Sequence, residues 1–226
     1  MAVSVSSIKQ ASQAKTAAVF EAGRLLDEMG IRWWLEAGTC LGAVRSGDFI
    51  AGDHDIDLGI VPGNESRWDE IISEFFKNGW VKGSAYRIYQ GIKLRLCFRL
   101  PHAGLHDEYN KAGKPTVDIF FFYEAGDKWW MGIFGPPKDA VGHMPFTVFY
   151  PHVFSRDLFS GMREIDFAGR KCLIPNPPET YLVERYGEGW RKPQGDYRFW
   201  RDCRAIVSVE EWQKFISKDN GLNKIQ

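Results

Sequence analysis

The sequence predicts an α/β fold in which helices pack on a small mixed β-sheet. Apolar and small residues recur with a helical period over 8–29, and Gly30 ends that pattern. A short apolar run at 31–36 and a segment of alternating acidic and apolar residues at 54–61 predict two strands. A third strand is predicted at 116–123, where the residues are almost all apolar. These four segments define the expected core.

The rest of the chain adds shorter elements. Gly, Pro and Asn mark the turns between them, and the spacing of apolar residues distinguishes helices from strands. We expect helices at 39–46, 65–77, 177–184 and 209–215, and β-hairpins at 84–100 and 163–174. Residues 128–162 are rich in Pro, Gly and aromatic side chains, and we expect them to wrap the mouth of a site or cover a sheet edge.

Length and composition favour a single globular domain. The chain has 226 residues, of which 44% are hydrophobic and 15% aromatic, enough for one well-buried core. We expect one domain over 1–226, with a catalytic core at about 30–125 and a closing segment at about 160–200. Lys and Arg total 29, as do Asp and Glu, so the chain has no basic excess to neutralise a nucleic-acid backbone. Nucleic-acid binding is therefore disfavoured, whereas a small nucleotide remains a suitable ligand.

Cysteine spacing and hydropathy argue against a zinc-binding or disulfide-rich protein and against a membrane-spanning one. The 4 cysteines lie far apart without a Cys-x-x-Cys pair, which disfavours a structural zinc site or a disulfide scaffold. No run approaches the about 18 apolar residues of a transmembrane helix, and the N-terminal residues do not form a signal peptide. We therefore expect reduced cysteines and a cytoplasmic location.

The segment Asp55-Ile56-Asp57 is the strongest indication of function. Residues two apart on a strand point to the same face, so Asp55 and Asp57 lie side by side while Ile56 faces the core. Two adjacent carboxylates repel each other, which raises the pKa of one of them unless a cation lies between them. Hard oxygen ligands of this kind suit Mg²⁺ or Mn²⁺. The strand is therefore predicted to bind a divalent metal ion.

A second feature lies upstream, where the apolar run 31–36 reaches Gly38-Thr39 and a short helix. Backbone N–H groups at such a helix start can bind a phosphate. Thr39 is equally an ordinary N-cap, and on its own that structural interpretation is the better one.

Taken together, these two features resemble a known superfamily. Gly-[Ser/Thr], a loop and Asp-apolar-Asp on a strand is the signature of polymerase-β-like nucleotidyltransferases. Within that superfamily, residues 38–45 (Gly-Thr-Cys-Leu-Gly-Ala-Val-Arg) and 49–57 (Phe-Ile-Ala-Gly-Asp-His-Asp-Ile-Asp) closely resemble the LicD family, which includes the fukutin-like proteins. Residues 165–187 resemble the closing segment of the family, so the resemblance covers roughly 30–195. Family members usually carry Pro-Trp in place of Ala51-Gly52, and an acidic or aromatic residue in place of His54.

The family pattern implies a third metal-facing carboxylate on a neighbouring strand, and Asp118 matches that position. Asp118 is a charged residue inside an apolar run, so burial requires that it have a cationic partner or take up a proton. The alternative to a metal ligand is a buried salt bridge from Asp118 to an arginine.

Three residues near these carboxylates have less certain roles. Asp53 lies on the same strand face one step earlier and is expected to support the site, although a metal ligand or an acceptor-activating base is also compatible. Arg45 follows the short helix and is expected to contact a phosphate, with an ion pair to Asp48 or Asp53 as the alternative. His54 points to the other side of the strand and is expected to be structural.

The resemblance implies a mechanism and a substrate class. Asp55, Asp57 and Asp118 would hold Mg²⁺ or Mn²⁺, with Asp53 in the same catalytic group and Gly38, Thr39 and Arg45 binding the substrate. LicD-like proteins are implied to move a phosphoalcohol, of the phosphocholine or ribitol-phosphate type, from a CDP-linked donor to a hydroxyl of a glycan or surface polymer. One alternative is a nucleotidyltransferase that moves NMP from an NTP to a small molecule or protein. A second is a non-catalytic nucleotide- or carbohydrate-binding domain.

Overall fold

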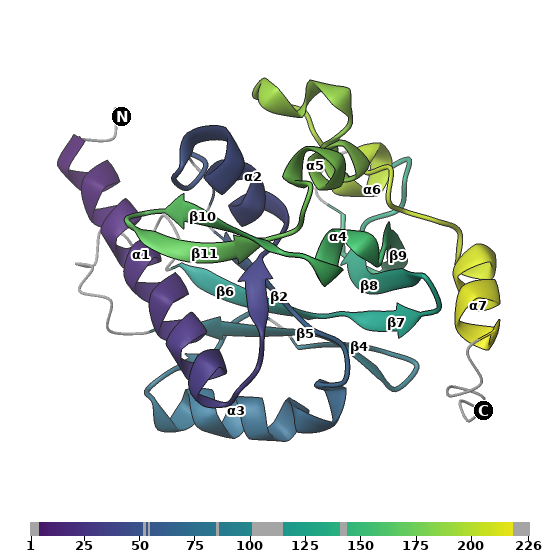
Figure 1. Ribbon diagram of the computed structural model, residues 1–226, viewed down its shortest axis with the longest axis horizontal. Helices are drawn as coiled ribbons and strands as arrows, with labels where there is room; N and C mark the ends of the chain where they lie inside the picture. Colours follow the sequence, from purple (N-terminus) through teal and green to yellow (C-terminus); the bar gives the residue numbers. More distant parts are fainter. Residues whose placement is uncertain are drawn as a thin grey trace.

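The structure is a computed structural model that describes residues 5–51, 53, 55–84, 86–100, 115–140 and 144–218, with side chains from residue 13 onward. Helices pack on a mixed central sheet, and two smaller antiparallel sheets lie beside it (Figure 1). This arrangement confirms the predicted α/β class.

The central sheet has the strand order β1-β2-β6-β5-β3, with β4 also paired to β5. Its strands are β1 (Trp33–Leu35), β2 (Asp55–Ile60), β3 (Val81–Lys82), β4 (Arg87–Tyr89), β5 (Ile92–Arg99) and β6 (Thr116–Phe121). Strands β2 and β6 are parallel, and the other described pairs of this sheet are antiparallel. The predicted β4–β5 hairpin turns at Gln90–Gly91, where both residues have positive φ angles of 48° and 81°.

The two parallel strands, β2 and β6, carry the candidate site aspartates, and they differ in how they are buried. In β2, Ile56, Leu58 and Ile60 are fully buried, while Asp55 and Asp57 lie on the opposite face, as the alternation predicted. From Val117 to Phe121, β6 is buried on both faces, which explains its continuous apolar sequence.

Helices cover the central sheet. α1 (Val5–Glu28) contacts β1 and β6, and α3 (Trp68–Lys77), which follows the 3-10 turn η1 (Glu65–Arg67), packs against α1 and β5 (Figure 1). The third helix, α2 (Ala37–Ser46), lies against β1 and β2 and begins two residues before the predicted start. The apolar side chains that these helices bury join those of the sheet in one core.

A second sheet forms where no strand was predicted. It consists of β7 (Tyr123–Ala125), β8 (Lys128–Gly135) and β9 (Val148–Ser155), all antiparallel. Pro151 of β9 lies opposite Gly132 of β8, and both residue types weaken the sequence signal of a strand. Proline is tolerated because β9 is the edge strand of this sheet. Residues 128–162 therefore form strands that the sequence did not predict, while Gly132, Ile133, Phe134 and Phe146 line a pocket, in agreement with the expectation that this segment wraps the mouth of a site.

The C-terminal part follows the predicted pattern more closely. After α4 (Asp157–Ser160), strands β10 (Arg163–Phe167) and β11 (Arg170–Ile174) form the expected hairpin, which turns at Ala168–Gly169. Helix α5 (Pro178–Tyr186) extends two residues beyond the predicted end. It is followed by η3 (Glu188–Arg191), α6 (Phe199–Asp202) and α7 (Val209–Lys218). α5 lies beside α2 and contacts α6, and both α5 and α6 lie above the second sheet in Figure 1.

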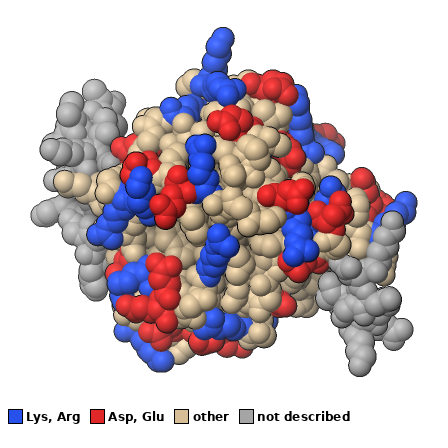
Figure 2. All heavy atoms as spheres, in the orientation of Figure 1, with Lys and Arg blue, Asp and Glu red and all other residues tan. Residues whose placement is uncertain are grey.

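The surface carries both signs of charge. Figure 2 shows Lys and Arg interspersed with Asp and Glu on the face that is drawn, without a large field of one sign. This agrees with the equal totals of basic and acidic residues. Among the described helices, none is both long and apolar enough to cross a membrane.

Candidate active site

The turn between β1 and α2 lies directly against β2. The backbone N–H of Glu36 donates to the carbonyl of Asp57 (2.9 Å), and the N–H of Gly38 donates to the carboxylate oxygen Oδ2 of Asp57 (3.2 Å). In return, the N–H of Asp57 donates to Oγ1 of Thr39 (2.9 Å). A Cβ at Gly38 would lie 3.0 Å from Asp53 Oδ2 and 3.4 Å from Asp57 Oδ2. Glycine therefore lets both carboxylates approach the turn.

These contacts correct one expectation about the start of α2. The N–H of Gly38 was predicted to be free for a phosphate, but it donates to Asp57. The Thr39 side chain is buried and binds the backbone of β2, so it serves as a structural link between helix and strand. A contact of either residue with substrate stays a prediction.

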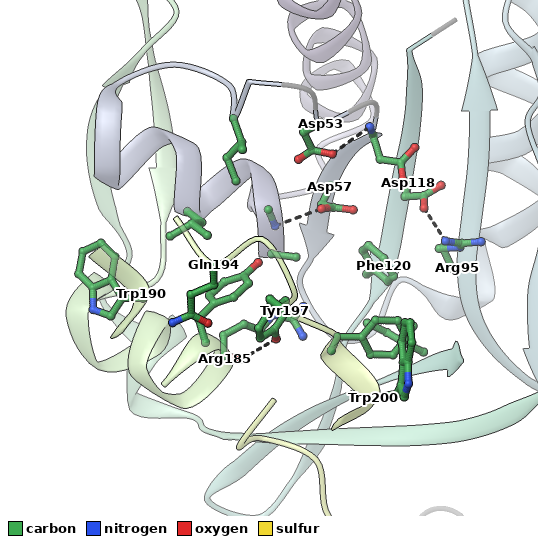
Figure 3. Close-up of a pocket in the computed structure, with 18 of the residues that line it drawn as sticks. Asp53, Asp57, Arg95, Asp118, Phe120, Arg185, Trp190, Gln194, Tyr197 and Trp200 are labelled. Atoms are coloured by element: carbon green, nitrogen blue, oxygen red, sulfur yellow. Dashed lines mark hydrogen bonds and ion pairs between the residues drawn. The ribbon is translucent and has the colours of Figure 1, made fainter. Parts of the chain in front are cut away.

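Three of the predicted acidic residues meet at the β2–β6 pair. Asp57 is the register partner of Asp118, and Asp55 is the register partner of Thr116, whose Oγ1 donates to Asp55 Oδ1 (2.8 Å). Neighbouring strands lie about 4.8 Å apart, so the backbones at Asp57 and Asp118 are that close. Figure 3 shows the carboxylates of Asp53, Asp57 and Asp118 grouped at one end of a pocket, which Asp55 also lines.

Asp118 has an arginine partner, which was the alternative to its role as a metal ligand. Nη1 of Arg95, on β5, lies 2.5 Å from Asp118 Oδ2. The other carboxylate oxygen, Oδ1, is buried and has no hydrogen-bond partner among the described residues. The salt bridge therefore satisfies one oxygen of this carboxylate and leaves the other without a protein partner among the described residues.

Asp53 adds a fourth carboxylate and is supported by a residue that sequence reasoning missed. Its Oδ1 accepts a weak hydrogen bond from the N–H of Asp55 (3.4 Å), and its backbone carbonyl accepts a hydrogen bond from Nζ of Lys15. Lys15 is buried on α1, and its ammonium group interacts with the charges of Asp53, Asp55 and Asp57. Burial lowers the pKa of Lys15, while these aspartates oppose that shift. The sequence indicated only that Lys15 lies on a helix, and it gave no sign that this side chain reaches the aspartates.

The electrostatics of the group favour a cation. The pKa of Asp57 lies well above its ordinary value, first because of burial and then because of the charges of Asp118, Asp53 and Asp55. Burial also raises the pKa of Asp118, although Arg95 lowers it in part. Nearby positive charge would relieve both effects.

The side chains as they stand do not form a ready metal centre. Within the described ranges, no group of three or more His, Cys, Asp or Glu side chains is arranged so that it could hold a metal ion. All four carboxylates already have protein partners: Asp57 binds Gly38 and Asp118 binds Arg95. Asp55 binds Thr116, and Asp53 binds the N–H of Asp55. The donor set nevertheless fits a hard divalent cation, because it offers closely spaced carboxylate oxygens and the unpartnered Oδ1 of Asp118.

The carboxylates form part of a pocket of about 950 Å³. Asp53, Asp55, Asp57 and Asp118 line it, together with Gly38 and Arg45 from α2. The facing walls come from β8, from α5 to α6, and from Phe146, and they include the following aromatic residues: Phe134, Phe146, Tyr186, Trp190, Tyr197, Phe199 and Trp200. One end is acidic and the other aromatic, as Figure 3 shows. The volume is sufficient for a nucleotide-sized ligand.

Arg45 lies in the pocket wall, and its expected contact with a phosphate stays a prediction. It is half-buried, and it forms no ion pair with Asp48 or Asp53 within the described part of the chain. The alternative that assigned Arg45 to such a pair is therefore not supported. His54 and Gly52 lie outside the described residues, so the expectation for His54 stays a prediction.

A buried polar network beside the pocket was also missed. Glu36, which is completely buried, accepts hydrogen bonds from Trp34, Tyr181 and Arg185. Glu36 is a charged residue at the end of an apolar run, the same signal that identified Asp118. Arg185 and Tyr181 gave no comparable signal, because a helix that begins at Pro178 does not reveal which side chains it buries.

Comparisons with known proteins agree with the geometry of this site. Residues 30–177 match the model of the LicD/FKTN/FKRP nucleotidyltransferase domain. Ribitol-5-phosphate transferase FKTN of Homo sapiens is 24% identical over 200 residues, which are 86% of this chain and 38% of the relative. Ribitol 5-phosphate transferase FKRP of Homo sapiens is 56% identical over 170 residues, 73% of this chain and 29% of the relative. The uncharacterized protein RP689 of Rickettsia prowazekii is 39% identical over 169 residues, 74% of this chain and 52% of the relative.

The chain spans well under half the length of the FKTN and FKRP proteins that it matches. What the match covers is the domain that contains β1, α2, β2 and β6, the elements that carry the carboxylates. The chain belongs to the LicD/FKTN/FKRP family, and the part that matches is its nucleotidyltransferase domain.

Proposed function

We propose that this protein is a metal-dependent phosphotransferase that moves a phosphoalcohol from a CDP-linked donor to a hydroxyl group of a glycan or surface polymer. The observation that carries the proposal is the grouping of Asp55, Asp57 and Asp118 in a pocket large enough for a nucleotide. Two relatives named ribitol-5-phosphate and ribitol 5-phosphate transferases support a ribitol-phosphate type of donor over a phosphocholine type.

The carboxylates are proposed to hold Mg²⁺ or Mn²⁺. Asp55 is exposed at the start of β2, Asp57 is recessed, and Asp118 offers its unpartnered Oδ1. A bound divalent ion would neutralise the charge of a diphosphate and polarise the phosphorus that is attacked. It would also remove the repulsion that raises the pKa of Asp57.

The chain's own residues would then bind and orient the two substrates. Arg45 has no carboxylate partner within the described residues and presents a planar fork suited to a phosphate. Arg95 favours the ionised form of Asp118 and binds its Oδ2, so that Oδ1 has no protein partner among the described residues and is proposed to contact the ligand. The aromatic end of the pocket is proposed to exclude water from the donor and to pack against the base or the acceptor ring.

The test is to incubate the purified chain with Mg²⁺ and a panel of CDP-alcohols, including CDP-ribitol and CDP-choline, and separately with NTPs. Release of CMP supports the proposal, whereas release of pyrophosphate indicates nucleotidyl transfer. If neither product forms, the direct binding of each nucleotide is measured by calorimetry. Binding without turnover would favour a non-catalytic domain and contradict the proposal. Asp57→Asn and an excess of EDTA are the controls, and both are expected to abolish CMP release.

A further inference from the structure

The turn that contacts Asp57 is held in an unfavourable backbone conformation. Ala37, its central residue, has a φ angle of +41°, in the left-handed region that residues with a Cβ rarely adopt. No glycine relieves it at that position, so the surrounding contacts must hold the turn in place. The next residue, Gly38, donates its N–H to the Asp57 carboxylate.

The contacts that hold Ala37 come from α5. The N–H of Ala37 donates to the hydroxyl of Tyr181 (3.2 Å), and that hydroxyl donates to Oε1 of Glu36 (2.5 Å). Nη2 of Arg185 also donates to Oε1 of Glu36 (2.5 Å), and Nε1 of Trp34 donates to Oε2 (2.7 Å). All four side chains that make these bonds are at most 3% exposed. The network is thus buried, and Glu36 accepts a hydrogen bond from each of the three side chains Trp34, Tyr181 and Arg185.

A continuous set of hydrogen bonds then leads to the candidate metal ligand. Glu36 and Gly38, the two neighbours of Ala37, both donate to Asp57, one to its carbonyl and one to its carboxylate. Displacing Ala37 would therefore move the donor that orients Oδ2 of Asp57. Tyr181 itself lies too deep to touch a ligand, whereas Arg185 also lines the pocket.

We propose that Tyr181 and Arg185 are positioning residues that orient the Asp57 carboxylate through the strained turn at Ala37. Both residues lie beyond the residues 30–177 matched by the family model. The inference rests on the proposed function in one respect, because it takes Asp57 to be a metal ligand. Helix α5 thereby sets the geometry of a carboxylate that is far away in the sequence, before any ligand arrives.

A purely structural role for Tyr181 and Arg185 would give a different experimental result from an orienting role. If Tyr181 and Arg185 only stabilise the fold, their removal lowers the free energy of unfolding and leaves the affinity of the folded protein for a divalent ion unchanged. If they orient Asp57, the affinity for the ion falls as well, because residues that orient metal ligands typically contribute about 10- to 100-fold.

The decisive variant is Tyr181→Phe, which removes one hydroxyl and keeps the ring. Tyr123→Phe is the matched control, since it also removes a hydrogen-bonded, largely buried tyrosine hydroxyl, one that donates to the Lys93 carbonyl (2.6 Å) and is not part of the turn. Free Mn²⁺ is counted by electron paramagnetic resonance in titrations of the metal-free proteins. We expect Tyr181→Phe to bind Mn²⁺ about tenfold more weakly than wild type and Tyr123→Phe to bind it equally well. Equal affinity in all three proteins would overturn the inference.

Two further measurements complete the test. Arg185→Lys keeps the charge but loses the planar fork, and it is expected to weaken Mn²⁺ binding less than Arg185→Met does; the reverse order contradicts the inference. Amide hydrogen exchange at Gly38 should be faster in Tyr181→Phe than in either wild type or Tyr123→Phe, and an unchanged rate overturns the inference. If wild type binds no Mn²⁺ and releases no CMP, the proposed function fails, and the exchange rate of Gly38 alone decides whether α5 holds the turn.

Discussion

Asp57 and Asp118 are register partners across the parallel strands β2 and β6. This pairing places two carboxylates about one strand spacing apart inside a sheet whose β6 strand is buried on both faces. The arrangement is costly in the absence of a cation, and the pKa of each group is raised by burial. Its cost to the metal-free protein can be measured.

Asp57→Asn is expected to stabilise the metal-free protein while abolishing turnover. At pH 7, loss of the charge should raise the free energy of unfolding by about 1 kcal/mol. The folded-state pKa of Asp57 lies above its ordinary 3.8, so the wild-type group opposes folding as the pH rises through that folded-state pKa. The advantage of the Asn variant should therefore shrink as the pH falls toward 3.8. Urea unfolding in EDTA at several pH values measures it, and a variant with near-normal CMP release would remove Asp57 from the mechanism.

Arg95→Met tests the partner of Asp118. Removing the guanidinium leaves a carboxylate that is only 7% exposed without its counter-charge. We expect the free energy of unfolding to fall by about 2 kcal/mol, less than for a fully buried pair because Arg95 is partly exposed. Adding Asp118→Asn in the same chain should restore most of the loss. Denaturant unfolding of the four proteins of this cycle measures the coupling, and equal effects in both backgrounds would show that the pair is not coupled.

The helices and strands with a clear periodicity of apolar residues could be predicted from the sequence. The candidate site residues were then identified from their positions on these elements. The alternation around Ile56 fixed which face of β2 carries the aspartates, and Asp118 was visible as a charge within an apolar strand. That Asp118 lies on a strand next to the one that carries Asp55 and Asp57 was implied only by the family resemblance, since one sequence does not reveal which strands are neighbours. The parallel register confirms that Asp57 and Asp118 are adjacent.

What sequence reasoning missed depends on tertiary contacts. The second sheet was hidden because Gly132 and Pro151 interrupt its strands, and Pro151 is compatible with the sheet because it lies on the edge strand β9. Lys15 reads as a surface residue of an amphipathic helix, yet it reaches the acidic group 38 residues away. The contacts of Glu36 with Tyr181 and Arg185 span up to 149 residues, which no local pattern can predict.

His152 is expected to make the protein sensitive to acid. It is completely buried, its Nδ1 lies 3.0 Å from the carbonyl of Tyr150, and its Nε2 has no partner among the described residues. Burial, and then the charge of Arg185, lower its pKa well below 6.5. The unfolded chain therefore binds a proton that the folded protein excludes, and stability falls as the pH drops below 6.5, by up to about 1.4 kcal/mol per pH unit.

The variant His152→Asn checks this expectation. Its amide keeps a donor for the Tyr150 carbonyl but does not titrate, so stability should depend less steeply on pH between about 6.5 and 4.5. Thermal unfolding across that range compares the two slopes. Identical slopes would show that His152 is not the group responsible, even if the variant is less stable at every pH.

Arg45→Lys is expected to weaken donor binding without unfolding the protein. The side chain lies in the pocket wall without an ion pair in the described residues, and lysine replaces a planar fork by a point charge. The dissociation constant of a CDP-alcohol, measured by calorimetry with Mg²⁺, should rise about tenfold, close to the loss of one charge-assisted hydrogen bond. An unchanged constant would contradict the assigned phosphate contact.

Lys15→Met should increase the dependence of stability on a divalent ion. The ammonium group of Lys15 is the buried cation that interacts with Asp48, Asp53, Asp55 and Asp57, and removing it leaves their mutual repulsion uncompensated. The metal-free variant should melt at a lower temperature than wild type, more so at low ionic strength, because salt screens the repulsion. Saturating Mg²⁺ should then raise its melting temperature by more than it raises that of wild type. Lys171→Met, which removes an exposed lysine paired with Asp166, is the control and should leave the Mg²⁺ effect unchanged. If Mg²⁺ shifts the Lys15 variant no more than wild type, Lys15 does not balance the charge of the acidic group.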